Sequence, residues 1–173
     1  LPRIDVAIED GSLASRPALL ELIARTKAAK GAVHLMGLAS PGGVHSHQDH
    51  IIALAKILFV AGVPVYLHLF LDGRDTPPES SEDFLGALEA YQKEKNVTVA
   101  SVGGRYYTMD RDKRWQRTVM GYDVIAKHEG YEGRTAVSAR AAIEQAHADG
   151  VTDEFVFPVA IDCDRDVTIK AGD

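Results

Sequence analysis

The stretch from Gly103 to Trp115, GGRYYTMDRDKRW, concentrates basic side chains in an acidic protein. The 173 residues carry a formal net charge of −6, from 25 acidic and 19 basic residues. Positions 105–117 hold five basic and two acidic residues, which leaves a local charge of +3. Arginine donors match phosphate and carboxylate oxygens, and converging cations repel unless an anion offsets them. The stretch predicts a site for a small, multiply charged anion, with Arg105 and Arg111 as ligands.

A second polar segment, DGRDTPPES, follows an apolar run that ends at Leu71. Asp-Gly and Pro-Pro are turn signals, so one interpretation is an ordinary turn with a local Arg–Asp pair. The other is chemical. Arg74 can form a bidentate pair with a ligand carboxylate, and Asp75 can hold a hydroxyl or accept its proton.

A third segment, SPGGVHSHQDH, places two glycines before a group of imidazoles and a carboxylate. His45, His47, Asp49 and His50 are metal-ligand types, which permits a metal-dependent hydrolase. Alternatively, His45 contacts a phosphate or carboxylate, while the other three begin a helix whose dipole favours an early Asp. No Gly-Lys-Ser/Thr follows, so the segment is not a Walker motif.

The elements that position these segments alternate along the chain. The pattern predicts strands at 32–39, 63–72, 97–104 and 154–161. It predicts helices at 15–31, 47–62, 80–95, 111–130 and 136–150. Helices of this length between strands favour right-handed crossovers and a mainly parallel sheet covered on both faces, a three-layer α/β/α fold. In the helix at 111–130 we expect Trp115 to anchor in the core.

Each of the three polar segments follows a predicted strand. In a doubly wound sheet, ligands bind at the carboxyl ends of the strands, in the loops that lead to the next helices. All three segments should therefore open at one edge of the sheet and line one cleft.

Composition restricts the class of protein. Its acidity argues against a nucleic-acid or membrane-surface binder, which needs an extended positive face. Lys56, Gly62, Pro64 and His68 interrupt the most apolar run, which favours a buried helix and strand over a membrane span. The single cysteine, Cys163, fits a reducing cytoplasm. Because the chain begins LPRID without Met, we interpret it as a piece of a longer protein.

Three stretches closely resemble the cofactor-independent (2,3-bisphosphoglycerate-independent) phosphoglycerate mutases: HLMGLASPGGVHSH, LHLFLDGRDTPP and GGRYYTMDRDKRW. The resemblance extends over nearly the whole chain. In that family one domain carries a serine nucleophile and two divalent metal ions, usually manganese, with magnesium as an alternative. A second domain, inserted in the first, binds the glycerate part of the substrate. The chain resembles this inserted domain, with 1–14 as a connecting segment and 15–173 as a phosphoglycerate-binding domain incomplete at its C-terminus.

The resemblance implies roles for matching residues. His45 would contact the substrate phosphate or carboxylate, and Arg74 and Asp75 would hold the glycerate. Asp75 would also be catalytic, handling the proton of the hydroxyl that gains or loses phosphate. Arg105 and Arg111 would bind substrate. The implied glycolytic reaction interconverts 3-phosphoglycerate and 2-phosphoglycerate through a phosphoserine intermediate.

The chain also departs from the family pattern. It has no Asn-Phe-Arg-x-Asp-Arg motif, and the serine and metal-ligand clusters belong to the other domain, so no metal is expected here. We expect a folded monomer that binds a small-molecule substrate but cannot turn it over alone. The stand-alone hydrolase and a non-catalytic anion-binding module remain the alternatives.

Overall fold

One mixed sheet organises the computed structural model, which describes residues 1–92 and 97–173. Its order is β1-β2-β3-β5-β4. The strands are β1 (Val33–Leu38), β2 (Val65–Leu71), β3 (Val97–Gly104), β4 (Thr135–Ala136) and β5 (Val159–Ile161). The first three run parallel, as do β4 and β5, and only the β3–β5 pair within the described residues is antiparallel. The predicted α/β class with a mainly parallel sheet is confirmed.

Among the described residues, five α-helices overlap the predicted ranges, and two others, at 2–9 and 105–108, lie where no helix was predicted. They are α1 (Pro2–Glu9), α2 (Pro17–Ala29), α3 (Gln48–Val60), α4 (Ser81–Gln92), α5 (Arg105–Thr108), α6 (Trp115–Tyr122) and α7 (Ala139–Ala148). Shorter turns are the 3-10 segments η1 (Ser12–Ser15), η3 (Tyr131–Gly133) and η4 (Asp153–Phe155), and the π segment η2 (Asp123–Lys127). Positions 93–95 of the helix predicted at 80–95 lie outside the described residues.

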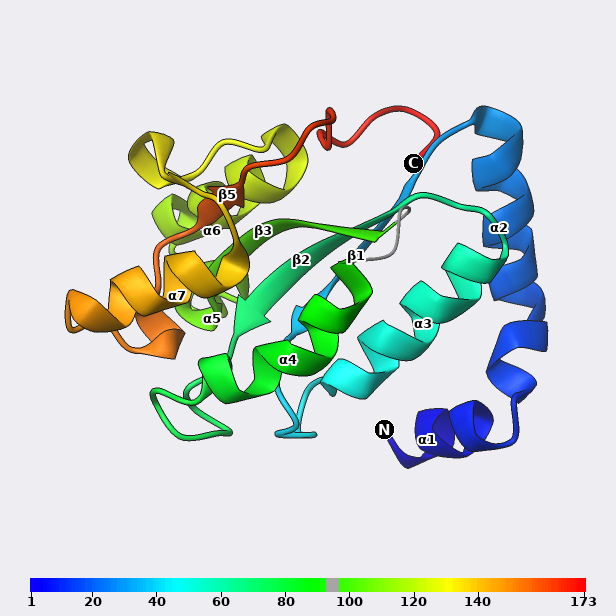
Figure 1. The fold of residues 1–173 in the computed structure, drawn as a ribbon, viewed down its shortest axis with the longest axis horizontal. Helices are drawn as coiled ribbons and strands as arrows, with labels where there is room; N and C mark the ends of the chain where they lie inside the picture. The colour runs from blue at the N-terminus through cyan, green and yellow to red at the C-terminus, as the bar shows by residue number, and fades with distance from the viewer. Residues whose placement is uncertain (93–96) are drawn as a thin grey trace.

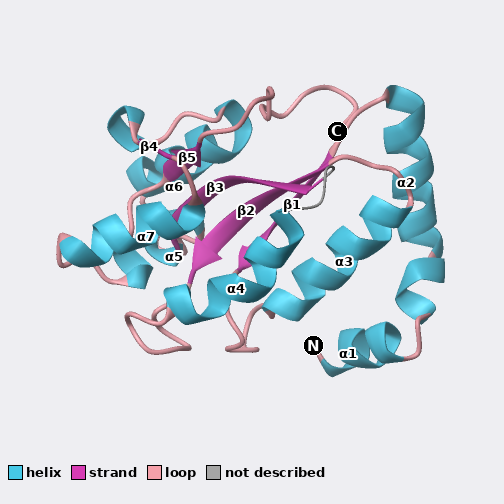
Figure 2. Cartoon of the chain, viewed as in Figure 1, coloured by secondary structure: helices cyan, strands magenta, loops and turns pink. Residues whose placement is uncertain are grey.

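Helices cover one face of the sheet. Figures 1 and 2 show α3, α4 and α7 in front of the strands, and each of these helices contacts them. β2 is apolar at five of its seven positions and almost wholly buried, because it lies between β1 and β3 with layers on both sides. Leu58 of α3 and Leu85 and Leu88 of α4 pack into the same hydrophobic core.

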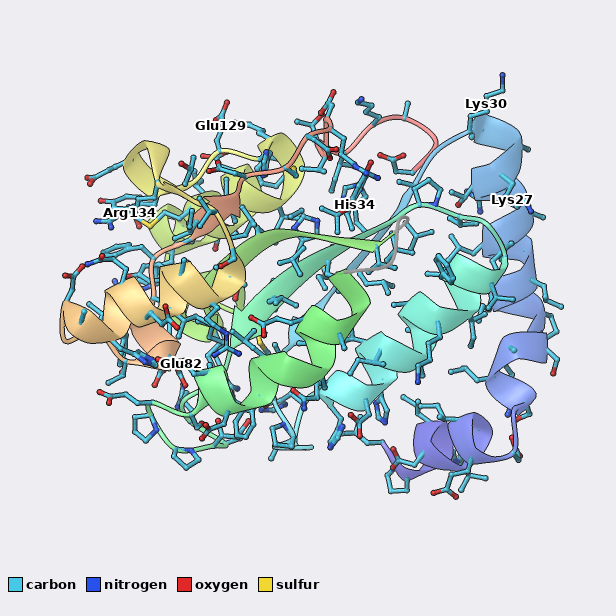
Figure 3. The ribbon with its side chains drawn as sticks, in the orientation of Figure 1. Lys27, Lys30, His34, Glu82, Glu129 and Arg134 are labelled. Atoms are coloured by element: carbon cyan, nitrogen blue, oxygen red, sulfur yellow. The ribbon has the colours of Figure 1, made fainter. Side chains whose placement is uncertain are left out.

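The opposite face carries a polar chain that crosses three strands. His34 Nδ1 lies 2.9 Å from His68 Nε2, and His68 Nδ1 lies 2.8 Å from Ser101 Oγ. Burial, with smaller effects of neighbouring imidazoles, lowers the pKa of His68 to about 3. The segment 162–173 contacts the strands here, since Tyr66 Oη donates to Asp166 O at 3.5 Å and the Ala32 N–H donates to Asp173 Oδ1 at 2.8 Å. Figure 3 labels His34 close to this segment. Asp173 lies 3.4 Å from His34.

The N-terminal helix packs against the rest of the chain. Ala7 of α1 is buried, and Asp5 Oδ1 lies 2.6 Å from His50 Nε2 of α3. The boundary between a connecting segment at 1–14 and a binding domain at 15–173 stays a prediction. Among the described residues, no helix has the length and apolar character that a bilayer span requires.

The expectation that Trp115 anchors in the core is wrong. Its side chain is 68% exposed, and Val119 and Tyr122 on the same stripe of α6 are exposed too. The helix instead packs through its other side, where Gly121 lies against the backbone of α5 and Arg117 lies over an α5 ring. Periodicity located the helix but chose the wrong face.

Candidate functional site

The three polar segments meet at one edge of the sheet. Leu38 at the end of β1 pairs with Phe70, and Leu71 at the end of β2 pairs with Gly104, so three strands end level with one another. A pocket of about 200 Å³ opens there. Its lining comes from all three segments, from α6 and from η4: His45, Arg74, Arg105, Tyr106, Met109, Asp110, Arg111, Asp112, Arg117 and Glu154.

Arg105 is the most firmly held cation of the pocket. Its side chain is 9% exposed, and its Nη1 donates to Asp72 Oδ1 and to Asp75 Oδ2, each at 2.7 Å. Burial alone would lower the pKa of Arg105, but the hydrogen bonds to Asp75 and Asp72 outweigh it and raise the pKa. The guanidinium therefore stays charged with a fixed orientation, which suits recognition of an anion.

Asp72 anchors the loop after β2. The carboxylate is 1% exposed, and it accepts hydrogen bonds from Ser40 Oγ at 2.7 Å and from the backbone N–H of Asp75 at 3.0 Å. Burial by itself raises the pKa of Asp72. Hydrogen bonds from Ser40, Asp75, Arg105 and Arg74 outweigh burial, and the net pKa is lowered. Sequence reasoning treated Asp72 as part of a turn, although an Asp at the end of a buried strand was the available signal.

The remaining predicted residues lie around the same pocket. His45, Arg74 and Arg111 line it. Asp75 lies next to the pocket, where its Oδ2 accepts a hydrogen bond from the lining residue Arg105. The side chain of Arg74 is 47% exposed and lies 3.5 Å from Glu154. The structure thus brings together all five residues that the sequence selected, although their roles toward a ligand remain proposals.

The His/Asp cluster does not converge in the same way. His47 begins α3, where its Nδ1 accepts a hydrogen bond from the Asp49 N–H. His50 turns toward Asp5 of α1, and only His45 lines the pocket. Within residues 1–92 and 97–173, no group of three or more His, Cys, Asp or Glu side chains is arranged to hold a metal ion. The described residues therefore give the hydrolase interpretation no geometric support.

Arg117 also lines the pocket, although the sequence analysis selected only Arg105 and Arg111 from this charged stretch. Its guanidinium carbon lies 3.7 Å from the centroid of the Tyr106 ring, and its Nη1 lies 3.3 Å from Asp110 and 3.4 Å from Asp112. The Asp110 side chain is almost fully buried, which requires a partner for its charge. This requirement for a partner follows from the burial of Asp110, which the local charge pattern does not show.

Comparison with known proteins gives the family of the chain. A family model described as the BPG-independent PGAM N-terminus matches residues 4–173. The chain belongs to this family. The 2,3-bisphosphoglycerate-independent phosphoglycerate mutase of Gluconobacter oxydans is 50% identical over 161 residues, which cover 93% of this chain and 31% of that protein. Its counterpart from Chloroflexus aurantiacus is 47% identical over 178 residues and matches 100% of this chain.

Solved structures place the family fold on the chain as well. A crystal structure of Leishmania mexicana phosphoglycerate mutase, determined at low cobalt concentration, superposes with a TM-score of 0.86 at 31% sequence identity. The match covers 98% of this chain and 33% of that one. The chain thus spans about a third of the length of the family members it matches.

Proposed function

We propose that the chain is the substrate-binding part of a 2,3-bisphosphoglycerate-independent phosphoglycerate mutase. The enzyme interconverts 3-phosphoglycerate and 2-phosphoglycerate, an isomerisation of glycolysis and gluconeogenesis. The observation that carries this proposal is the shared pocket, in which His45, Arg74, Arg105 and Arg111 arrive from loops after three different strands. The names of the relatives agree with this substrate class.

Different pocket residues would bind different groups of a phosphorylated acid. Arg105 is fixed by two carboxylates and presents its remaining donors to the ligand, while the more exposed Arg74 and Arg111 close around it. Arg105 contacts Oδ2 of Asp75, so we assign Oδ1 to the substrate hydroxyl. Asp75 holds that hydroxyl and takes or returns its proton.

The rest of the enzyme supplies the covalent chemistry. Phosphate passes from the substrate to a serine outside this chain, the glycerate turns in its pocket, and the phosphate returns to the other hydroxyl. The divalent ions, manganese or magnesium, would be bound outside this chain and would stabilise charge on the transferred phosphate. The cobalt named for the Leishmania mexicana structure supports metal dependence in a relative. We further propose a cytoplasmic monomer.

The direct test is mutase activity of the full-length polypeptide that contains this chain, coupled to enolase. Arg111→Ala should lower kcat/KM for 3-phosphoglycerate about tenfold to a hundredfold, because one charge-assisted contact with the substrate is lost. Asp75→Asn should lower kcat more than it changes KM, because it removes the proton acceptor.

Arg25→Ala is the matched control, since this arginine is exposed on α2 and does not line the pocket. It should leave both kinetic constants unchanged. Wild-type enzyme without mutase activity, or an Arg111→Ala variant as active as wild type, would refute the proposal.

A further inference from the structure

The short η4 turn forms a further wall of the pocket, and its position is fixed by two glycines. Gly73, at φ +66°, has no room for a side chain, because a Cβ there would lie 2.9 Å from the backbone nitrogen of Glu154. A Cβ on Gly104 would collide with the carbonyl group of Glu154. The loop after β2 and the end of β3 therefore pack closely against the backbone of Glu154 on two sides.

Asp153 ties the same turn to the helices. Its side chain is fully buried, and its Oδ2 accepts hydrogen bonds from the backbone N–H groups of Ser80 and Ser81, each at 2.9 Å. Its Oδ1 lies 2.8 Å from His147 Nε2 on α7, and its own N–H donates to Pro78 O. With these anchors the η4 backbone cannot shift without breaking several buried hydrogen bonds.

Glu154 projects from this fixed turn into the pocket. Its side chain is 16% exposed, whereas that of Arg74, its partner at 3.5 Å, is 47% exposed. A long arginine that is half in solvent has many rotamers, and it loses that freedom when it binds a ligand. The contact uses Nη1 of Arg74 and leaves Nε and Nη2 for a ligand.

We propose that Glu154 is a positioning residue for Arg74. It holds the guanidinium over the pocket before substrate arrives, so that less side-chain entropy is lost on binding. The inference rests on the proposed function and adds a residue to it. The opposite role, an internal anion that competes with substrate for Arg74, predicts tighter binding once the carboxylate is removed.

The test is a double-mutant cycle in the full-length enzyme, with KM and kcat measured for 3-phosphoglycerate. Glu154→Gln should raise KM about threefold to tenfold, the ordering cost of one flexible side chain, and leave kcat within about twofold. In an Arg74→Ala background the same substitution should change KM by less than about twofold, because its effect acts through that arginine. Glu154→Asp should also raise KM, because the η4 backbone is fixed and the shorter side chain leaves its carboxylate farther from Arg74.

Glu21→Gln, on an exposed position of α2, is the control and should match wild type. Circular dichroism and thermal melting verify that each variant is folded. If Glu154→Gln does not fold, Glu154→Asp replaces it in the test. An unchanged or lowered KM for folded Glu154 variants overturns the inference. So does an equal rise in KM with or without Arg74. A loss of the proposed function itself is distinguished by the wild-type enzyme, which would then have no mutase activity.

Discussion

At the scale of single residues, the site depends on carboxylates that hold cations in place. Asp72 and Asp75 fix Arg105, and Asp110 and Asp112 contact Arg117. Arg105 and Arg117, two of the five basic residues of this stretch, are therefore paired with carboxylates in the folded protein. What the site offers an anion is orientation of its guanidinium groups rather than a large net charge.

Asp72→Asn tests this arrangement. The substitution leaves buried Arg105 with one charged partner instead of two, and it should lower the free energy of unfolding by about 1–3 kcal/mol. Urea denaturation monitored by circular dichroism measures the change. Asp164→Asn, at a side chain that is almost fully exposed, should have no measurable effect. Equal stability of the two variants would show that the Asp72–Arg105 pair is not stabilising.

The sequence predicted those pocket residues that stand out by their side-chain type and by their neighbours in the chain. Arg105 and Arg111 were found by charge density, and Arg74 and Asp75 by their place after a strand. Glu154 could not be found this way, because η4 reaches the pocket only by packing between Gly73 and Gly104. The local sequence pattern indicates which residues have suitable chemistry. Tertiary contacts between distant segments determine which of these residues lie together in the pocket.

At the scale of elements, the helices and strands with a clear apolar pattern were predictable, whereas the four-residue α5 beside the pocket was not. The sequence did not predict β4, which has only two residues, or the 3-10 turn in place of the first part of the strand expected at 154–161. Elements of two or three residues are too short to show an apolar periodicity from which they could be predicted. Their positions come from hydrogen bonds to other segments, such as those of Asp153 to Ser80 and Ser81.

His147 links α7 to α4 and η4, and it should make stability depend on pH. Its ring nitrogens lie 2.8 Å from Glu82 and 2.8 Å from Asp153, and Figure 3 shows Glu82 at the start of α4, on the side of α7. Burial lowers the pKa of His147, but hydrogen bonds to Asp153 and Glu82 outweigh it, so the pKa is raised.

A raised folded-state pKa gives a stabilisation that is complete below the unfolded value of about 6.5 and is lost as the pH rises through the folded value. The difference in unfolding free energy between wild type and His147→Gln should therefore shrink as the pH rises above the unfolded value of about 6.5. Urea denaturation at each pH gives this difference, and a constant or growing difference would contradict the charged bridge.

His68 should have the opposite pH dependence. Its pKa of about 3 in the folded protein lies below the unfolded value of about 6.5, so between them the unfolded chain binds the extra proton. The free energy of unfolding should fall as the pH drops through this range, and less steeply in His68→Gln. Denaturation curves at several acidic pH values test this, and parallel slopes for the two proteins would refute it.

At the scale of the whole molecule, α6 presents an apolar stripe of Trp115, Val119 and Tyr122 to solvent. Trp115 is the single tryptophan of the chain, so its fluorescence reports this surface. We expect efficient quenching by iodide in the native protein and little red shift on unfolding in urea, because the indole is already exposed. A blue-shifted emission that resists quenching would mean that the ring is buried.

The parallel arrangement of β1, β2 and β3 is what makes one site out of three separate segments. The most direct test is a titration of isotope-labelled protein with 3-phosphoglycerate, followed by nuclear magnetic resonance. Signals of His45, Arg74, Asp75, Arg105 and Arg111 should shift together and fit one dissociation constant. Shifts confined to a single loop, or different constants for the three loops, would contradict a shared site.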